Sequence, residues 1–247
     1  MLFLIFVLGL IIGSFLNVVI YRLPRGESLV YPPSHCTNCG HKLSPLELIP
    51  LISYIFLKGR CKSCGAKISI RYPLIELLTA IIFIINYINF SNLIVLTAGL
   101  LFSSLLIVLA FIDFDHQILP DRLTLGALII GLIFSLFRTD ISFVLSISGV
   151  LAAGGLLFII AFLSKGGMGG GDIKMMAMVG SFTGPLTAVS AIFLGAIIAL
   201  FAHLPGIISG QTGMKSKLPF GPFLALASFL LWIWGEEIFG LYLALVM

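Results

Sequence analysis

Residues 142–163 read SFVLSISGVLAAGGLLFIIAFL, a run of twenty-two residues without a charged side chain. A bilayer core of about 30 Å is crossed by a helix of roughly 20 apolar residues, so this run has the length and composition of a membrane span. The whole chain agrees, because it is 60% hydrophobic and only 10% charged, with a mean hydropathy of +1.19. Soluble domains carry about a quarter of their residues as charged side chains. The sequence therefore predicts an integral membrane protein.

Further apolar runs are separated by polar, glycine-bearing or proline-bearing breaks, which predicts an all-α polytopic fold of about eight transmembrane helices. The first run, 1–20, lacks the basic start and the small-residue cleavage pattern of a signal peptide, so we expect it to be retained. The others lie at about 73–89, 93–112, 123–137, 174–188, 189–208 and 221–245. The run at 174–188 is interrupted by Gly180, Gly184 and Pro185, so it either spans the membrane or dips and returns.

Residues 21–72 form the main water-exposed segment, with eight basic residues against Glu27 and Glu47. If Met1 lies outside the cell, this segment lies in the cytosol, and so do Arg122, Lys165, Lys174, Lys215 and Lys217. Only Arg138 is then outside, which satisfies the positive-inside rule. The basic residues therefore indicate orientation in a cytoplasmic membrane and give no sign of a nucleic-acid partner. We expect three parts: a first helix (1–20), a cytosolic domain (21–72) and a transmembrane core (73–247).

All four cysteines lie in the cytosolic domain, in two matching units, CTNCGHKL (36–43) and CKSCGAKI (61–68). Each unit is a C-x-x-C followed by glycine, the pattern of a knuckle that delivers two thiolates to one tetrahedral metal ion. The sequence predicts that zinc is bound by Cys36, Cys39, Cys61 and Cys64. Two disulfides are the alternative, but stable disulfides are rare in the cytosol. Four thiolates leave no position for water, so this zinc is expected to be structural, with His35 and His41 beside it as bystanders.

Acidic side chains cluster at the cytosolic ends of two spans. The third run ends as LAFIDFDHQILPDR (109–122), with Asp113, Asp115 and Asp121, and the fifth ends at SKGGMGGGDIK (164–174), with Asp172. Asp113 directly follows the apolar run, whereas Asp115 is farther out and can simply be solvated. Asp121 suits a helix N-cap. Because both clusters lie on the same side of the membrane, we expect Asp113 and Asp172 to be the functional pair.

Five glycines surround Asp172, namely Gly166, Gly167, Gly169, Gly170 and Gly171. Glycine lets another chain approach the backbone closely, so Gly169, Gly170 and Gly171 are predicted to bind the extended backbone of a substrate. The alternative is a flexible loop in which Asp172 caps the next helix. Two carboxylates held close together cannot both ionise cheaply, so one acts as base toward water while the other donates a proton to a carbonyl oxygen. The pair predicts peptide hydrolysis by an aspartyl dyad.

Six motifs follow in order over nearly the whole chain. They are GSFLNVVIYRLP (13–24), the C-x-x-C pair, SCGAKISIRYPLIE through Glu76, DFDHQILPD, GMGGGDIK and PFGP (219–222). In these motifs the chain resembles the type IV prepilin peptidases, membrane aspartyl proteases with a G-x-G-D signature. The resemblance implies that Asp113, the first acid of DFDHQILPD, and Asp172, the acid of G-x-G-D, are catalytic. It further implies a prepilin or pseudopilin substrate, cut after a glycine at the cytosolic face of the bilayer.

Many members of that family also methylate the new N-terminus with S-adenosylmethionine, and they generally keep the cytosolic cysteine domain. The resemblance therefore implies the same second activity here, with S-adenosylmethionine as cofactor. The residues themselves show no glycine fingerprint on a strand-to-helix turn, so no residue is predicted to bind the methyl donor.

Two other functions are compatible with parts of the sequence. A metal-dependent lipid-phosphate transferase would bind magnesium through Asp113, Asp115 and Asp121, but it leaves Asp172 without a role. A transporter would relay protons through its aspartates, but those acids should then lie near the bilayer midplane rather than at the ends of spans.

Two smaller features are expected to serve packing. Gly13, Ser14 and Asn17 are small or polar residues on one face of the first helix, which is typical of close helix packing. The PFGP stretch at 219–222 breaks the chain on the cytosolic side. Prolines are common at a helix start, although this stretch could also shape the mouth of the active site.

Overall fold

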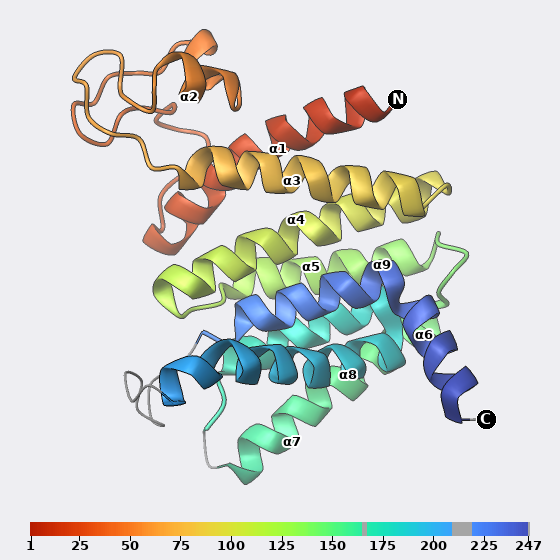
Figure 1. The fold of residues 1–247 in the computed structure, drawn as a ribbon. Helices are drawn as coiled ribbons and strands as arrows, with labels where there is room; N and C mark the ends of the chain where they lie inside the picture. The colour runs from red at the N-terminus through yellow and green to blue at the C-terminus, as the bar shows by residue number, and fades with distance from the viewer. Residues whose placement is uncertain (165–166, 209–218, 247) are drawn as a thin grey trace. The chain divides into compact units, whose positions relative to one another are not determined.

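The computed structural model describes residues 1–164, 167–208 and 219–246, and nearly all regular structure in these ranges is helical (Figure 1). Three lysines used above to infer orientation, Lys165, Lys215 and Lys217, lie outside the described residues, as does Gly166. The chain divides into two compact units, Met1–Ser91 and Asn92–Met247. The predicted all-α fold is confirmed.

In the first unit, α1 (Leu2–Arg22) and α3 (Arg71–Asn89) pack side by side (Figure 1). Glycines on α1 make this contact close. A Cβ on Gly9 would lie 2.5 Å from Ala80 Cα, and one on Gly13 would lie 2.7 Å from Glu76 Cα. Within a bilayer the hydrophobic effect does not drive apolar helices together. Small residues therefore stabilise the helix pair by letting the backbones approach and gain van der Waals contact. The close packing predicted for Gly13 is confirmed.

The segment between α1 and α3 has little regular structure. It contains the 3-10 turns η1 (Leu23–Arg25) and η2 (Pro45–Leu48) and the short helix α2 (Ile52–Phe56). Two hydrogen bonds tie the segment and the helices together. The Asn17 side chain donates to Tyr72 O (3.1 Å), and Leu51 N–H donates to Glu76 Oε2 (2.8 Å). Glu76 is buried in α3, so its carboxylate fixes the start of α2 against that helix.

The second unit is a helical bundle around α8. It contains α4 (Leu93–His116), α5 (Asp121–Ser135), α6 (Phe143–Gly149), the π-turn η3 (Val150–Gly154), α7 (Gly155–Leu163), α8 (Gly170–Ile208) and α9 (Gly221–Val246). Helix α8 packs against α5, α6, α7 and α9. Its first half supplies fully buried side chains, among them Met176, Val179 and Phe182. Gly180 meets Gly149 of α6 backbone to backbone, since a Cβ on Gly180 would lie 2.2 Å from Gly149 O.

Six helices in the described residues are long and apolar enough to cross a membrane, namely those starting at Leu2, Arg71, Leu93, Phe143, Gly170 and Gly221. The predicted run at 123–137 corresponds to α5, which has 15 residues. The runs at 174–188 and 189–208 form the single helix α8. Its apolar part of 36 residues is about 54 Å long at 1.5 Å per residue, well beyond a bilayer core of about 30 Å. A break inside α8 resolves this mismatch.

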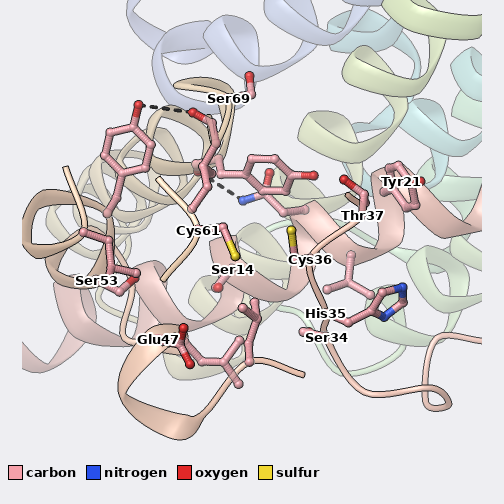
Figure 2. Close-up of a pocket in the computed structure, with 18 of the residues that line it drawn as sticks. Ser14, Tyr21, Ser34, His35, Cys36, Thr37, Glu47, Ser53, Cys61 and Ser69 are labelled. Atoms are coloured by element: carbon pink, nitrogen blue, oxygen red, sulfur yellow. Dashed lines mark hydrogen bonds between the residues drawn. The ribbon is translucent and has the colours of Figure 1, made fainter. Parts of the chain in front are cut away.

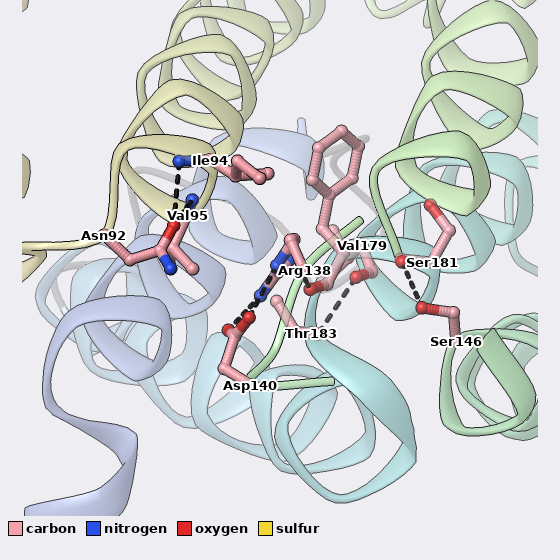
Figure 3. A network of polar contacts seen from close by, with 10 residues as sticks. Asn92, Ile94, Val95, Arg138, Asp140, Ser146, Val179, Ser181 and Thr183 are labelled. Atoms are coloured by element: carbon pink, nitrogen blue, oxygen red, sulfur yellow. Dashed lines mark hydrogen bonds and ion pairs between the residues drawn. The ribbon is translucent and has the colours of Figure 1, made fainter. Parts of the chain in front are cut away.

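The break lies at Gly184, whose φ of 78° and ψ of 178° are not helical, and Pro185 follows it. Proline has no N–H, so the carbonyl four residues earlier loses its helical partner. Helix α6 and the segment between α5 and α6 supply donors instead. Ser146 Oγ donates to Ser181 O (2.9 Å), and Arg138 Nη1 donates to Phe182 O (2.7 Å) (Figure 3). Gly184 and Pro185, noted in the sequence as interruptions, thus divide α8 without leaving these two carbonyls unpaired.

Arg138 is held in place for this role. Its side chain is 2% exposed, its Nε donates to Asp140 Oδ1 (3.0 Å), and its guanidinium lies 4.9 Å from the ring centroid of Trp232 on α9. A buried guanidinium is tolerated only when its charge and its N–H groups find partners. The carboxylate, the ring and the Phe182 carbonyl are those partners, so Arg138 links α8 and α9 through one side chain.

We predict that Arg138→Met lowers the free energy of unfolding by about 2–3 kcal/mol, because it removes a charged donor from a buried carbonyl and leaves that carbonyl unpaired. Arg122→Met is the matched control, since Arg122 is exposed in the same unit. Thermal unfolding of both variants in detergent micelles measures the difference. Equal melting temperatures for the two variants would show that Arg138 does not support the break.

Candidate functional site

The two cysteine units fold as matching knuckles in the first unit. In each, the N–H of the first cysteine donates to the carbonyl five residues later, and its own carbonyl accepts from the following glycine, at 2.8–2.9 Å. That glycine has a left-handed backbone, with φ of 73° at Gly40 and 70° at Gly65. Side-chain-bearing residues pay about 1–2 kcal/mol for this conformation, which explains a glycine after each C-x-x-C.

The knuckles bring all four cysteines together. The Sγ atoms of Cys36, Cys39, Cys61 and Cys64 lie within 4.8 Å of one another, and all four are free thiols. Cys36 Sγ and Cys64 Sγ are 3.9 Å apart. Four sulfurs placed about 2.3 Å from one tetrahedral zinc ion would stand about 3.8 Å apart, so the donor set fits that metal. The predicted cluster therefore forms, and its four cysteines are free of disulfides in the structure.

Nearby donors stabilise the thiolate of Cys64. The backbone N–H of Ala66 and then the Asn38 side chain lower the pKa of Cys64 to about 6. Asn38 Nδ2 lies 3.7 Å from Cys64 Sγ. A metal binds the thiolate and not the thiol, so these donors favour the ligating form. The two histidines turn elsewhere, as expected of bystanders: His35 Nδ1 lies 3.0 Å from Pro33 O, and His41 Nε2 lies 3.4 Å from Glu47 Oε2.

We predict that removal of the metal unfolds the segment between α1 and α3 while those two helices persist, because the segment has little other regular structure. Treatment of the full-length protein with a strong thiol-competing chelator should open protease sites within residues 26–70 and leave far-ultraviolet circular dichroism nearly unchanged. Cys64→Ser should reproduce this and lower the bound metal content. Ser63→Ala, a change of an exposed residue in the same knuckle, should neither open protease sites nor lower the metal content. Equal protease resistance of the chelator-treated, Cys64→Ser and Ser63→Ala proteins would contradict the prediction.

In the second unit, Asp113 lies in the last turn of α4. The helix runs on past the predicted end at 112 to His116, so Asp113 and Asp115 are helical. Asp113 is 6% exposed, and its Oδ2 accepts a hydrogen bond from Gly221 N–H (2.9 Å) at the start of α9. The N-terminal N–H groups of a helix lack partners within the helix and favour a negative charge. Helix α9 therefore presents a backbone donor to this carboxylate.

Asp172 lies in the first turn of α8, because that helix begins at Gly170 and not near 174 as predicted. Its side chain is partly buried, and its charge interacts electrostatically with that of Asp113. The last turn of α4 and the first turn of α8 thus place two acids, far apart in sequence, within range of each other. That the two acids act together as a catalytic pair stays a prediction.

Asp121 does not cap α5, so the N-cap prediction is wrong. Pro120 occupies the cap position, and Asp121 is the first helical residue. Its two carboxylate oxygens instead accept from Lys174 Nζ, both at 2.7 Å. Because Lys174 is on α8 one turn from the start of the helix, this ion pair ties the starts of α5 and α8 together. It also occupies the carboxylate that a magnesium site at Asp113, Asp115 and Asp121 would need.

The three glycines before Asp172 differ in their surroundings. A Cβ on Gly171 would lie 2.9 Å from Leu119 Cβ, so Gly171 allows α8 to pack against the chain between α4 and α5. A Cβ on Gly169 would lie 3.4 Å from Asp172 Oδ2, and one on Gly170 would meet no heavy atom within 4 Å. Room beside the acids is therefore found at Gly169 and Gly170, while Gly171 serves packing within the protein.

The structure gives Gly221 a contact with Asp113 that the sequence analysis does not predict, since PFGP is interpreted there mainly as an ordinary helix start. A Cβ on Gly221 would lie 2.7 Å from Asp113 Oδ2, so only glycine lets the N–H reach the carboxylate at this distance. The signal was available in the letters PFGP, since a glycine between phenylalanine and proline at a helix start suggests close approach to another group. Its partner could not be read from the sequence, because Asp113 is more than one hundred residues away.

We predict opposite outcomes for two neighbouring glycines. Gly171→Ala should lower the free energy of unfolding by about 1–3 kcal/mol, because the new methyl group overlaps Leu119. Gly170→Ala should be neutral or slightly stabilising, because the site is open and alanine favours a helix. Thermal unfolding in one detergent compares the two variants. A Gly171→Ala protein as stable as the unaltered protein would show that α8 does not need this close contact.

Comparison with known proteins gives one consistent result. Residues 7–90 match the family described as "Bacterial Peptidase A24 N-terminal domain", and residues 100–204 match "Type IV leader peptidase family". Proteins named "Prepilin leader peptidase/N-methyltransferase" are similar over nearly their full length. That of Dichelobacter nodosus is 38% identical over 95% of this chain and 92% of its own. That of Bacillus subtilis (strain 168) is 35% identical over 100% of both, and that of Pseudomonas aeruginosa is 37% identical over 96% and 91%. No solved structure matches.

Proposed function

Because the chain belongs to the type IV leader peptidase family, we propose that it is a prepilin leader peptidase and N-methyltransferase in which Asp113 and Asp172 form the catalytic pair. The observation that supports the proposal is that these two acids, at the end of α4 and the start of α8, lie within range of electrostatic interaction with each other. Both residues lie within 100–204, the part of the chain that matches the peptidase family.

The pair supplies both proton transfers that peptide hydrolysis requires. One carboxylate takes a proton from water as the water oxygen attacks the scissile carbonyl carbon, and the other acid donates its proton to the carbonyl oxygen. The tetrahedral intermediate then collapses: the carbon–nitrogen bond breaks, the leaving amine receives a proton from the first acid, and one hydroxyl of the intermediate returns its proton to the second carboxylate. The new carboxyl ends the leader, and the new amine begins the mature protein. The Gly221 N–H keeps Asp113 in position through these steps.

The open side of Gly169 and Gly170 is the proposed place for the substrate backbone. A peptide bond can be cut only when the chain around it is extended, since helical hydrogen bonds bury the carbonyl. Gly169 and Gly170 have no side chains and lie close to Asp172 in the sequence, so they leave room for such a segment. The excess of basic residues in 21–72 supports a cytosolic location for this side, with Met1 outside. The substrate is then a prepilin with its leader in the cytosol and its apolar helix in the bilayer.

The four-cysteine cluster is proposed to hold zinc as a structural ion. A site closed by four thiolates leaves no coordination position for water, so it stabilises the surrounding segment and does not hydrolyse the substrate. S-adenosylmethionine is proposed as the methyl donor on the strength of the relatives' name. When bound, it supplies an electrophilic methyl group for the new N-terminal amine.

Two conservative substitutions test the catalytic pair. Asp113→Asn and Asp172→Asn should each lower the rate of leader removal by at least about 10³-fold, because an amide can neither take nor give the required proton. Leader loss from a purified prepilin in detergent, followed by mass spectrometry, measures the rate. Asp115→Asn is the matched control, an exposed aspartate in the same turn of α4, and it should cut at a near-normal rate.

Normal cleavage by the Asp172→Asn enzyme would falsify the dyad. Another set of results would instead favour the metal-dependent alternative. In that case Asp113→Asn and Asp115→Asn would abolish cleavage, Asp172→Asn would retain it, and removal of magnesium would stop it.

A further inference from the structure

The short helix α2 turns its largest apolar side chains outward. Ile52, Ile55 and Phe56 are 51%, 71% and 83% exposed. Their spacing of three and four residues puts them on one side of the helix, which we call the apolar face. Leu46 of η2, the turn that contacts α2, is also exposed. Exposed apolar side chains gathered in this way mark a surface that meets a protein or a membrane.

The other side of α2 is already engaged within the first unit. Ser53, Tyr54 and Leu57 line a cavity of about 420 Å³, and Figure 2 shows Ser53 among the residues around it. The Tyr54 hydroxyl donates to Ile68 O (3.4 Å). Turning α2 about its axis to hide the apolar face would break this contact. The fold of the first unit therefore holds the apolar face outward.

The start of α2 is fixed at the level of a membrane boundary. Helix α3 has 19 residues and is about 28 Å long, so it just crosses a bilayer core of about 30 Å. Its first turns then lie where the headgroups meet the acyl chains. Glu76 is in the second turn of α3 and accepts from Leu51 N–H (2.8 Å), directly before α2. This bond keeps α2 at the level of the first two turns of α3 (Figure 1).

The charges around α2 favour a lipid surface over a second copy of the chain. Lys58 and Arg60 follow α2 directly and are exposed. Residues 48–75 contain no acidic side chain but five basic ones: Lys58, Arg60, Lys62, Lys67 and Arg71. Anionic headgroups attract basic residues near the membrane surface. Two copies joined through their apolar faces would instead bring like charges together.

We propose that the apolar face of α2 inserts into the lipid bilayer, at the boundary between headgroups and acyl chains of the leaflet in which α3 begins. Helices that lie in this boundary bury their apolar side about 5–10 Å deep, which agrees with the level set by Glu76. With Met1 outside, as proposed above, this is the cytosolic leaflet. The inference does not depend on the peptidase or the methyltransferase activity.

Tethering at both ends makes so short a helix sufficient. An isolated peptide of this length would lose its freedom of movement on binding a membrane, and three side chains would repay little of that cost. Here α1 and α3, two of the helices long and apolar enough to span a membrane, already hold the segment at the bilayer. Insertion is then an event within one molecule, at a high effective concentration. It keeps the cysteine knuckles close to the membrane surface.

The first test locates the apolar face with an added tryptophan. Full-length, metal-loaded Phe56→Trp protein is placed in lipid nanodiscs, and the fluorescence of the two natural tryptophans, measured on the unaltered protein, is subtracted. Lipids brominated in the upper part of their acyl chains should quench the added fluorescence, and aqueous iodide should not. Ser63→Trp, at an exposed position of the second knuckle, is the matched control and should show the reverse. Unchanged metal content shows that both variants are folded.

Two results of this test would overturn the proposal. Quenching by iodide that is as strong in Phe56→Trp as in Ser63→Trp would show that the apolar face lies in water. Fluorescence that neither iodide nor brominated lipid quenches would show that protein covers it, either the second unit or a second copy.

A second test measures what the insertion contributes. In nanodiscs, Phe56→Asp should speed amide hydrogen exchange in residues 49–58 by at least about tenfold, because the buried area of one large apolar side chain is lost and a carboxylate is excluded from the acyl chains. Ser63→Asp introduces the same charge outside the apolar face and should leave that exchange unchanged. Metal content should stay normal in both variants. Equal exchange in Phe56→Asp and the unaltered protein would show that α2 does not depend on lipid.

Discussion

The hydrogen bond from Gly221 N–H to the buried carboxylate of Asp113 is the contact on which the geometry of the second unit depends. It joins the end of α4 to the start of α9 at a buried carboxylate, where a hydrogen bond is stronger than in water. The ion pair between Lys174 and Asp121 acts alongside it and joins the starts of α5 and α8. Together they hold four helix ends near one another. Asp172, two residues before Lys174, is placed by the same arrangement.

Elementary rules of composition and spacing were enough to predict the class of fold, and they also placed two acids, Asp113 and Asp172, at the ends of apolar runs. Asp113 follows an apolar run and Asp172 precedes one, and the positive-inside rule puts both on one side of the bilayer. The cysteine cluster was equally readable, because two C-x-x-C-G units leave few other arrangements for one metal. Each C-x-x-C-G unit is a local pattern of a few neighbouring residues. The fold class and the orientation depend instead on the alternation of apolar and polar segments along the whole chain.

Contacts between distant segments were not readable in the same way. The sequence shows that Asp121 follows proline before an apolar run, which suits a cap, but it does not show that Lys174 will approach it. The interruption at Gly184 and Pro185 was visible, but its consequence was not. The freed carbonyls of Ser181 and Phe182 are paired by Ser146 and Arg138, whose polar side chains would otherwise be costly in an apolar bundle. Such pairings depend on which helices become neighbours, and that is decided by the packing of the whole unit.

Glu47 and Asp113 are both carboxylates with little exposed surface, but their surroundings differ. Glu47 Oε2 receives two donors from Ser44 and contacts the ring of His41, and these groups stabilise its charged form. Asp113 accepts one backbone N–H and faces a second acid, and two like charges at close range favour a shared proton. An acid that exchanges protons with a substrate needs this weaker stabilisation of its anion. Donor count and neighbouring charge therefore distinguish the Glu47 carboxylate from the proposed catalytic one within a single chain.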